Sequence, residues 1–216
     1  MKLSDTVTGG LKAVKDCVGV IDDDAAVRKG LCLMLEALNL EVHTYSTATE
    51  YLADTYGQSC CTCLVLDVRL PGISGFELQK RLLKEGRAPA IVFITGHGDI
   101  PMAVEAMRNG AVDFLQKPFV EQQLLDGVQK ALILARRSSE IREERQSVTA
   151  RSDCLTPKEH EVLAKLLQGL RTKEIATELG RSPKTIEEHR AHIMQKMHAS
   201  TIAELVSMCH LSNVTR

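Results

Sequence analysis

The stretch VGVIDDD, residues 18–24, joins a short apolar run to three consecutive carboxylates. Such a run, bounded by polar residues, is typical of a strand that is buried on both faces. The next segment, 25–38, has its apolar residues at helical spacing, and Asn39 is a suitable residue for the end of a helix. The stretch therefore predicts a first β–α unit with carboxylates at the end of its strand.

The same alternation of strand-like and helical segments repeats four more times along the chain. Strand-like runs are expected at 40–45, 63–66, 90–94 and 112–115. Helical segments are expected at 48–55, 76–83, 101–108 and from 121 onward. Five β–α units predict a doubly wound α/β domain, in which helices cover both faces of a parallel sheet.

The C-terminal third of the chain looks helical. A connector, residues 136–153, mixes basic and acidic side chains with few apolar anchors, so we expect a solvated helical extension that dissolves into a linker near 147–152. A short dimer-forming coiled coil is the alternative, although three or four clear heptads are missing. Four helices delimited by Gly and Ser-Pro signals are then expected. They cover about 157–168, 172–179, 183–197 and 200–211.

Composition and charge limit the class of protein. The 216 residues, 44 % hydrophobic and 25 % charged, suit one or two globular domains. No run of about 18 uncharged apolar residues exists, so no membrane span is expected. The N-terminal extension, residues 1–17, lacks the apolar core of a signal peptide, which predicts a cytoplasmic protein. Residues 1–135 carry 13 basic and 17 acidic side chains, whereas 136–216 carry 14 and 11, an asymmetry compatible with nucleic-acid binding at the C-terminus.

Seven cysteines raise the question of a disulfide scaffold. Their number is odd, the chain is not small and no export signal is present, so we interpret them as reduced thiols. Cys60, Cys61 and Cys63 form the one cluster, and no nearby Cys or His pattern completes a four-ligand metal site. Buried or loop thiols are expected there, with a redox or metal role as the alternative.

Polar residues interrupt the apolar runs at the ends of the predicted strands. Asp22 and Asp23 end the first strand, Asp67 the third and Thr95 the fourth, and Lys117 follows the fifth. Sites in doubly wound sheets form at the carboxyl ends of the strands, so these side chains are expected to converge. Clustered carboxylates repel each other, and a hard cation such as Mg²⁺ (or Mn²⁺) relieves that repulsion. One carboxylate can then attack phosphorus and form an aspartyl phosphate.

Seven motifs carry a resemblance to a known family. They are VIDDD (20–24), LDVRLPGISG (66–75), ITGHGD (94–99), FLQKPF (114–119), LTPKEHEVL (155–163), GLRTKEIATELG (169–180) and SPKTIEEHRAHIMQKM (182–197). With them, the chain from residue 18 is similar to the NarL/FixJ family of two-component response regulators, nearest to FixJ. The resemblance implies a flavodoxin-like receiver domain at 18–135 with strand order 2-1-3-4-5. It also implies a charged helical linker at 136–153 and an all-α, four-helix, LuxR-type helix-turn-helix domain at 154–216.

The resemblance assigns roles to the acidic residues. It makes Asp67 the phosphoacceptor, and Asp22, Asp23 and Asp67 the carboxylates of the metal site, together with the backbone carbonyl of Arg69. A phosphatase with an aspartyl nucleophile is a different possibility. That class needs a second aspartate two residues after the nucleophile, where this chain has Arg69, so the sequence favours a phosphorylation switch over a hydrolase.

The resemblance also assigns the switch residues. Thr95 matches the switch hydroxyl, Phe114 the switch aromatic and Lys117 the lysine that pairs with the phosphoryl oxygens. The bond between Lys117 and Pro118 matches the usual cis peptide of the family.

The helix expected at 183–197 is the predicted reading helix of the helix-turn-helix. One of its faces is apolar, and the other can enter a DNA major groove. Glu187 and Glu188 lie on the groove face, where some members of the family carry basic or apolar residues. The operator sequence of another family member can therefore not be assigned to this chain. The expected DNA-binding residues are Lys184, Thr185, Glu187, Glu188, Arg190, Ala191 and Lys196.

The resemblance implies a mechanism and partners. A sensor histidine kinase phosphorylates Asp67, and the receiver shifts toward a dimer that binds promoter DNA and regulates transcription, with RNA polymerase as a further partner. It implies a regulator and not an enzyme, apart from the receiver's part in its own phosphotransfer and dephosphorylation. The second hypothesis is a receiver whose C-terminal helices bind protein instead of DNA.

Overall fold

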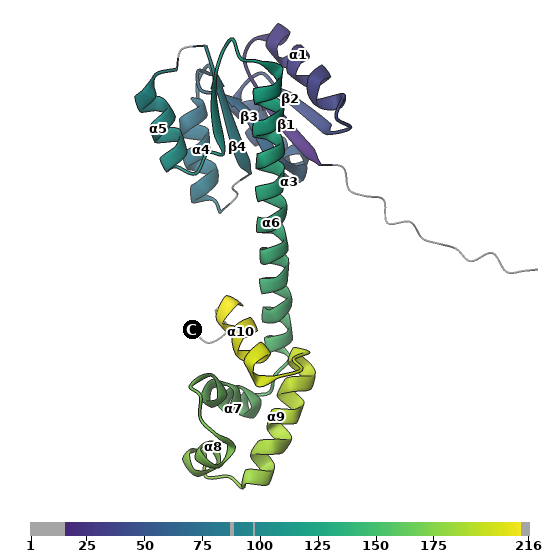
Figure 1. The fold of residues 1–216 in the computed structure, drawn as a ribbon, viewed down its shortest axis with the longest axis vertical. Coiled ribbons are helices and arrows are strands. Elements are labelled where there is room, and N and C mark those ends of the chain that lie inside the picture. Colours follow the sequence, from purple (N-terminus) through teal and green to yellow (C-terminus); the bar gives the residue numbers. More distant parts are fainter. Residues whose placement is uncertain (1–15, 87–88, 97, 213–216) are drawn as a thin grey trace, which may run out of the picture. The chain divides into compact units, whose positions relative to one another are not determined.

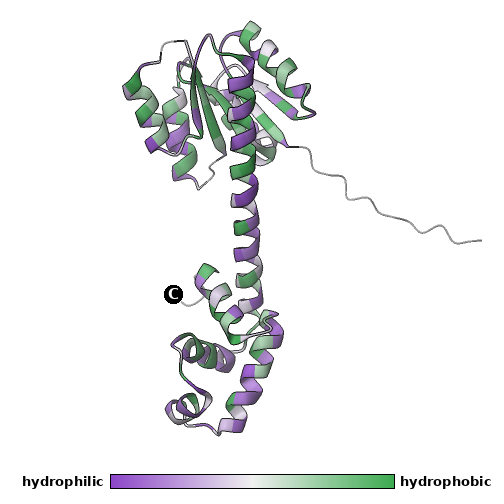
Figure 2. Ribbon diagram, in the orientation of Figure 1, coloured by the Kyte–Doolittle hydropathy of each residue, from purple (hydrophilic) through white to green (hydrophobic). Residues whose placement is uncertain are grey.

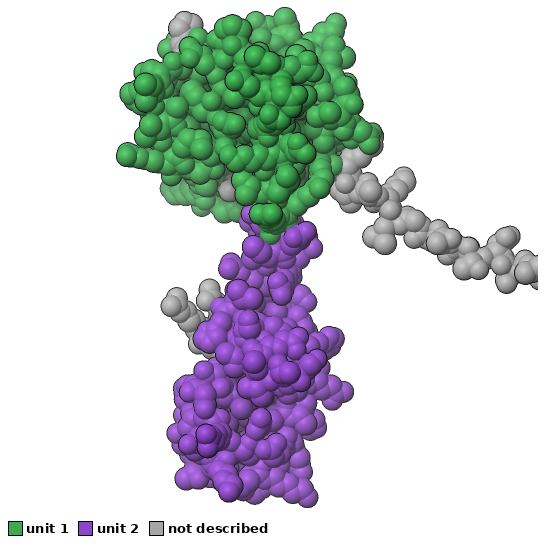
Figure 3. All heavy atoms as spheres, viewed as in Figure 1, with its two compact units in different colours: residues 1–137 green, residues 138–216 purple. Residues whose placement is uncertain are grey.

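The computed structural model describes residues 16–86, 89–96 and 98–212. The expected N-terminal extension, residues 1–17, lies almost entirely outside them. The chain forms two compact units, residues 1–137 and 138–216, which Figure 3 colours separately. Each unit is described by itself below.

The first unit is built on a five-stranded parallel sheet with the order β2-β1-β3-β4-β5 (Figure 1). Its strands are β1 (Cys17–Ile21), β2 (Glu41–Tyr45), β3 (Cys61–Asp67), β4 (Ala90–Thr95) and β5 (Asp113–Gln116). The helices that precede the connector are α1 (Ala25–Glu36), α2 (Ala48–Ala53), α3 (Thr55–Cys60), α4 (Gly75–Lys84) and α5 (Ile100–Arg108). The predicted doubly wound fold and its strand order are confirmed.

Two cores hold the helices against the sheet, one on each face. On one face, Leu78 and Leu82 of α4 pack with Leu66 and Phe93 of the strands, and α2 and α5 join them. On the other face, α1 and the connector helix α6 (Glu121–Asp153) pack against β1, β3 and β4. Figure 2 shows the hydrophobic colour concentrated on the strands, as expected for a sheet that is buried on both sides.

A register shift at the start of β3 separates neighbouring cysteines. Cys17 pairs with Cys61, but the next residue of β1, Val18, pairs with Cys63. The extra residue between them turns the side chains of Cys61 and Cys63 to opposite faces of the sheet, where they join different cores. The sequence cluster of three cysteines therefore does not exist as one cluster in the fold.

The helical segment between β2 and β3 is longer and more divided than the sequence predicts. The expected single helix at 48–55 is α2, and a second short helix, α3, follows it directly. Asp54 separates the two: its backbone is extended, and its carboxylate accepts the N–H of Gly57 as the N-cap of α3.

The connector differs from its prediction. The expected dissolution of the helix near 147–152 is wrong, because α6 continues without a break to Asp153. Val148 and Ser152 are buried, and Val148 belongs to the core of the second unit. Apolar contact at the end of the helix thus stabilises residues whose composition reads as a linker.

The second unit is helical. After α6 it contains α7 (Pro157–Leu167), α8 (Thr172–Glu178), α9 (Pro183–Met197) and α10 (Ile202–Ser212). Thr156 and Glu159 form the predicted capping box of α7. Buried side chains from all of these helices form one core. In the part of the chain that the structure describes, we find no helix with the length and apolarity needed to span a membrane.

Candidate functional site

The predicted polar residues of the first unit meet at the carboxyl edge of the sheet. Asp22 directly follows β1, Asp67 and Thr95 are the last residues of β3 and β4, and Lys117 follows β5. The side chains of Asp22 and Thr95 are fully buried, and Asp67 is nearly so. Buried charges at one edge of a sheet need partners, which the neighbouring strands provide.

Lys117 connects two of the carboxylates. Its Nζ donates to Asp22 Oδ2 at 2.6 Å and to Asp67 Oδ2 at 2.7 Å. The backbone N–H of Lys117 donates to the carbonyl of Thr95 at 2.8 Å and so extends the pairing of β4 and β5 by one step. The peptide bond between Lys117 and Pro118 is cis, as the family resemblance implies. The ammonium is thereby held between two carboxylates from two different strands.

Burial and pairing compete in the titration of this site. Burial raises the pKa of Asp22, although hydrogen bonds from Lys117 and from the backbone of Asp24 oppose that shift. Burial alone would lower the pKa of Lys117, but its hydrogen bonds to Asp22 and Asp67 outweigh this effect and raise it. The lysine is therefore a firmly charged partner at neutral pH.

The third carboxylate completes an acidic pocket formed by Asp22, Asp23 and Asp67. Carboxylate oxygens of the three residues lie within 4.8 Å of one another. Asp23 is exposed, whereas the other two are buried, so the pocket opens to solvent on the Asp23 side. Three oxygen donors around one point fit a hard divalent cation such as Mg²⁺, since Lys117 pairs with only two of the three carboxylates in the described part of the chain.

Local backbone contacts shape the wall of the pocket beside Asp67. The N–H of Arg69 donates to Asp67 Oδ1 at 2.9 Å. A Cβ atom on Gly75 would lie 2.3 Å from the carbonyl oxygen of Asp67, so only glycine allows the start of α4 to approach this closely. The role expected for the Arg69 carbonyl stays a prediction.

Thr95 and Phe114 lie beside each other next to the acidic pocket. A Cβ atom on Gly98 would come within 2.9 Å of both Thr95 Cγ2 and Phe114 Cε1, so the two side chains flank the same backbone position. The ring of Phe114 is half-buried and packs near Phe93, with ring centroids 6.4 Å apart. A change at Thr95 can therefore reach Phe114 across the backbone of Gly98.

The second unit places α8 and α9 as a helix-turn-helix. Gly180 adopts a positive φ of 60° after α8, and Ser182 caps α9 by accepting the N–H of Thr185. Ile186 and Ile193 of α9 are buried. On the other side of the helix, Lys184, Glu187, Glu188 and Ala191 are exposed.

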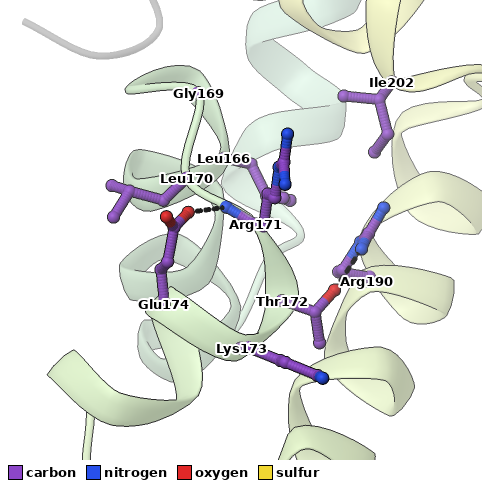
Figure 4. A pocket seen from close by; sticks show the side chains of 9 residues that line it. All are labelled: Leu166, Gly169, Leu170, Arg171, Thr172, Lys173, Glu174, Arg190 and Ile202. Atoms are coloured by element: carbon purple, nitrogen blue, oxygen red, sulfur yellow. Dashed lines mark hydrogen bonds between the residues drawn. The ribbon is translucent and has the colours of Figure 1, made fainter.

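Two of the predicted DNA-binding residues are engaged within the unit. Arg190 donates to Thr172 Oγ1 and lies 3.4 Å from Glu187 Oε1, which in turn accepts from Thr172 at 2.7 Å. Figure 4 shows Arg190 and Thr172 joined by this hydrogen bond in a pocket that Arg171 and Lys173 also line. Arg171 and Lys173 are exposed and basic, and the sequence analysis missed them. Their position at the start of α8 was the available signal.

A third predicted DNA-binding residue, Lys196, has a partner in the core. Its Nζ lies 2.7 Å from Glu159 Oε2, and the Glu159 side chain is 4 % exposed. Burial alone would raise the pKa of Glu159, but hydrogen bonds from Lys196 and Thr156 outweigh it and hold the pKa at about 2. Lys196 thus joins α9 to the capping box of α7.

We expect Glu159→Gln to destabilise the second unit by about 2–3 kcal/mol at neutral pH, allowing for solvent around half-buried Lys196. Because the folded pKa lies below the ordinary value, the carboxylate stabilises the fold above about pH 4.5 and loses this effect as the pH falls toward about 2. The difference in free energy of unfolding is measured by urea titration, with hydrogen exchange of the α7 and α9 amides as the readout. Glu161→Gln, which removes an exposed partner of Arg181, is the matched control. Equal stabilities of wild type and Glu159→Gln at neutral pH would contradict this role of Glu159.

Comparisons with known proteins agree on both units. Residues 18–129 match the family model described as "Response regulator receiver domain", and residues 153–209 match "Bacterial regulatory proteins, luxR family". The chain is 42 % identical to the response regulator protein TmoT of Ectopseudomonas mendocina, over 87 % of this chain and 84 % of the relative. It is 43 % identical to the transcriptional regulatory protein FixJ of Azorhizobium caulinodans, over 91 % and 93 %.

Two solved structures are similar to this chain over more than nine tenths of its length. The response regulator StyR is 42 % identical, with a TM-score of 0.78 over 91 % of this chain and 98 % of that one. Full-length FixJ from B. japonicum is 39 % identical, with a TM-score of 0.53 over 94 % and 100 %.

Proposed function

The chain belongs to the two-component response regulators that join a receiver domain to a LuxR-type DNA-binding domain, and we propose that Asp67 is its phosphoacceptor. The observation that supports this most strongly is the position of Asp67 at the end of β3, beside Lys117 and within the acidic pocket. Asp22 is fully buried and Asp23 lies outside the lysine contact, so Asp67 is the carboxylate best placed to meet both a phosphoryl group and an ammonium.

The residues of the pocket divide the chemistry among them. Asp22, Asp23 and Asp67, with the Arg69 carbonyl, would hold Mg²⁺, which when bound neutralises charge on a phosphoryl group. A carboxylate oxygen of Asp67 attacks phosphorus, and the bond from phosphorus to the donor breaks: a P–N bond in a phosphohistidine, a P–O bond in acetyl phosphate. The donor leaves with that electron pair. Lys117 already contacts Asp67, so its ammonium is positioned to pair with the phosphoryl oxygens.

Thr95 and Phe114 transmit the change. The hydroxyl of Thr95 donates to the new phosphoryl group, and Phe114, which lies next to the same backbone position, repacks behind it. The phosphorylated receiver favours a dimer, and two reading helices then bind two half-sites of promoter DNA. A sensor histidine kinase supplies the phosphoryl group, and RNA polymerase is a further partner at the promoter.

We assign the DNA contacts to side chains near the start of α8 and along α9. Arg171, Lys173 and Lys184 are basic and exposed, so they can reach phosphates, and exposed Glu188 and Ala191 can face the groove. Thr185 is half-buried and its hydroxyl pairs with Ser182, so it reaches the groove only if that pair opens. Glu187 and Arg190 act mainly by fixing Thr172 and the turn, and Lys196 acts mainly by pairing with Glu159. We therefore still propose α9 as the reading helix, but we place its DNA contacts nearer its N-terminus than the sequence prediction did.

The expected effects of two α9 substitutions differ in kind. Lys184→Ala should weaken binding to every DNA sequence alike and reduce the salt dependence by about one phosphate contact. Glu188→Ala should cost about 1–3 kcal/mol at one operator position and relax the preference there, because a carboxylate on a groove face can accept from cytosine N4. Fluorescence anisotropy with an operator and a scrambled duplex, at two salt concentrations, measures both effects.

Lys158→Ala is the matched control, since it removes the same charge from an exposed site on α7. Lys158 is next to Glu159, and Glu159 contacts Lys196 near the C-terminal end of α9. Lys184 lies near the N-terminal end of that helix, about 18 Å away along its axis. If Lys158→Ala and Lys184→Ala weaken binding equally, or if Glu188→Ala tightens binding to both duplexes alike, our placement of the DNA surface is wrong.

A further inference from the structure

A second group of ligand-type side chains lies at the opposite edge of the same sheet. Cys17, Glu41 and Cys61 are the first residues of β1, β2 and β3, whereas Asp22 and Asp67 follow or end their strands. Five residues of strand separate the two edges, a distance of about 15 Å. The cluster is therefore distinct from the acidic pocket, and the proposed phosphorylation makes no use of it.

The topology brings residues together that lie far apart in the sequence. Cys17 stands in register with Glu41 on one side and with Cys61 on the other. Glu41 and His43 are two residues apart on β2 and so share a face of the sheet. Cys60, the last residue of α3, contacts both Cys17 and His43 and completes the group.

The donor atoms of this group point at one another. Cys17 Sγ lies 3.2 Å from Cys60 Sγ, Cys60 Sγ lies 3.8 Å from His43 Nε2, and His43 Nε2 lies 3.1 Å from Glu41 Oε1. All four donor atoms are within 4.8 Å of one another. Cys17 is buried, and the other three are half-buried or exposed, so the cluster is anchored on one side and accessible on the other.

We propose that Cys17, Glu41, His43 and Cys60 bind a divalent ion of the zinc class. Two sulfurs, one imidazole nitrogen and one carboxylate oxygen make a four-ligand set for Zn²⁺, in which sulfur lies about 2.3 Å and nitrogen or oxygen about 2.0–2.2 Å from the ion. Side-chain rotations that move the donor atoms by tenths of an ångström reach such a geometry from the observed distances. The thiols exclude Mg²⁺ and Ca²⁺, which prefer oxygen alone.

The surroundings of the cluster fit a ligand site. The ring of His43 lies beside that of Tyr56, with centroids 5.7 Å apart, and its Nε2 faces both Cys60 Sγ and Glu41 Oε1. Cys61 Sγ lies 2.9 Å from Cys17 Sγ and provides a third thiol beside the set. On binding, each coordinating thiol gives its proton to solvent and its sulfur forms the metal bond, so nothing is oxidised or reduced.

A disulfide is the competing chemistry of these thiols. It would join Cys17 to Cys60 or Cys61 and leave the imidazole and the carboxylate unexplained. A metal ion uses all four donor atoms, and it ties β1, β2 and α3 together at the edge where the sheet begins. The metal therefore accounts for more of the observed arrangement than a sulfur–sulfur bond does.

Cobalt titration of the full-length, reduced, chelator-treated protein tests the site without phosphodonor or DNA. Excess Mg²⁺ occupies the acidic pocket, and only thiolate ligands give a sulfur-to-cobalt charge-transfer band, so the two sites are distinguished. We expect one equivalent of Co²⁺ to produce this band and tetrahedral visible bands, and Zn²⁺ to displace it. The affinity should fall more than about tenfold in Cys60→Ser and in His43→Gln.

Cys32→Ser is the matched control, because Cys32 is a half-buried thiol of α1 in the same unit. It should bind Co²⁺ as the wild type does. Zn²⁺ should also raise the thermal midpoint of the wild type and of Cys32→Ser, and at the same concentration it should raise that of Cys60→Ser less. Absence of the charge-transfer band, an unchanged band in Cys60→Ser, or a disulfide at Cys17 in protein isolated without oxidant would overturn the proposal.

Discussion

Replacing Asp67 by Asn is expected to abolish phosphorylation by a small phosphodonor such as acetyl phosphate in the presence of Mg²⁺. The amide keeps the size of the side chain but is a poor nucleophile, so the acyl phosphate bond cannot form. The loss should be complete, because neither other carboxylate of the acidic pocket can replace Asp67. Asp22 is fully buried and paired with Lys117, and Asp23 does not contact Lys117. Intact-protein mass spectrometry, with hydroxylamine to cleave acyl phosphates, measures the product.

Asp99→Asn is the control for this prediction. Asp99 is an exposed carboxylate of the same domain that caps α5 by accepting the N–H of Met102, and Asn is an equally good N-cap. This variant should be labelled as the wild type is. Hydroxylamine-sensitive label that persists in Asp67→Asn would place the acceptor on another residue.

The second large effect concerns the metal. Asp23→Asn should weaken Mg²⁺ binding more than tenfold, and Asp22→Asn should weaken it less, because one oxygen of Asp22 already accepts from Lys117. The chain contains no tryptophan, so isothermal titration calorimetry is preferable to intrinsic fluorescence for this measurement.

Asp24→Asn separates metal binding from general loss of negative charge. Asp24 adjoins Asp23, but its carboxylate accepts the N–H groups of Ala26 and Val27 as the N-cap of α1, a role that Asn also fills. We expect its Mg²⁺ affinity to stay within about twofold of the wild type. Equal losses in Asp23→Asn and Asp24→Asn would mean that the pocket attracts Mg²⁺ only through its net charge.

The acidic pocket could be predicted from sequence because each of its residues directly ends or follows a strand. A parallel sheet brings such positions to one edge whatever the details of its helices, so Asp22, Asp67 and Lys117 meet as expected. The five-stranded fold follows from the same strong periodicity. Local signals of this kind predict structure correctly without knowledge of distant contacts.

Features that depend on distant contacts could not be predicted in the same way. The end of α6 reads as a linker because nothing in its own composition reveals that Val148 joins the core of the second unit. The partners of Arg190 and Lys196 come from other helices, so helical periodicity alone left both as DNA contacts. Spacing along the chain does not reveal the group formed by Cys17, Glu41, His43 and Cys60, because the fold brings Cys17 to Cys60 across 43 residues.

The most direct test of the central claim, that phosphorylation of Asp67 controls DNA binding by α9, is a paired affinity measurement. Full-length wild type and Asp67→Asn are titrated, with and without acetyl phosphate and Mg²⁺, against a promoter fragment selected from the cognate genome. The affinity of the wild type should rise on phosphorylation by a factor within about 5–150, and that of Asp67→Asn should not change. An equal rise in both proteins, or no rise in wild type that is fully labelled at Asp67, would contradict the claim.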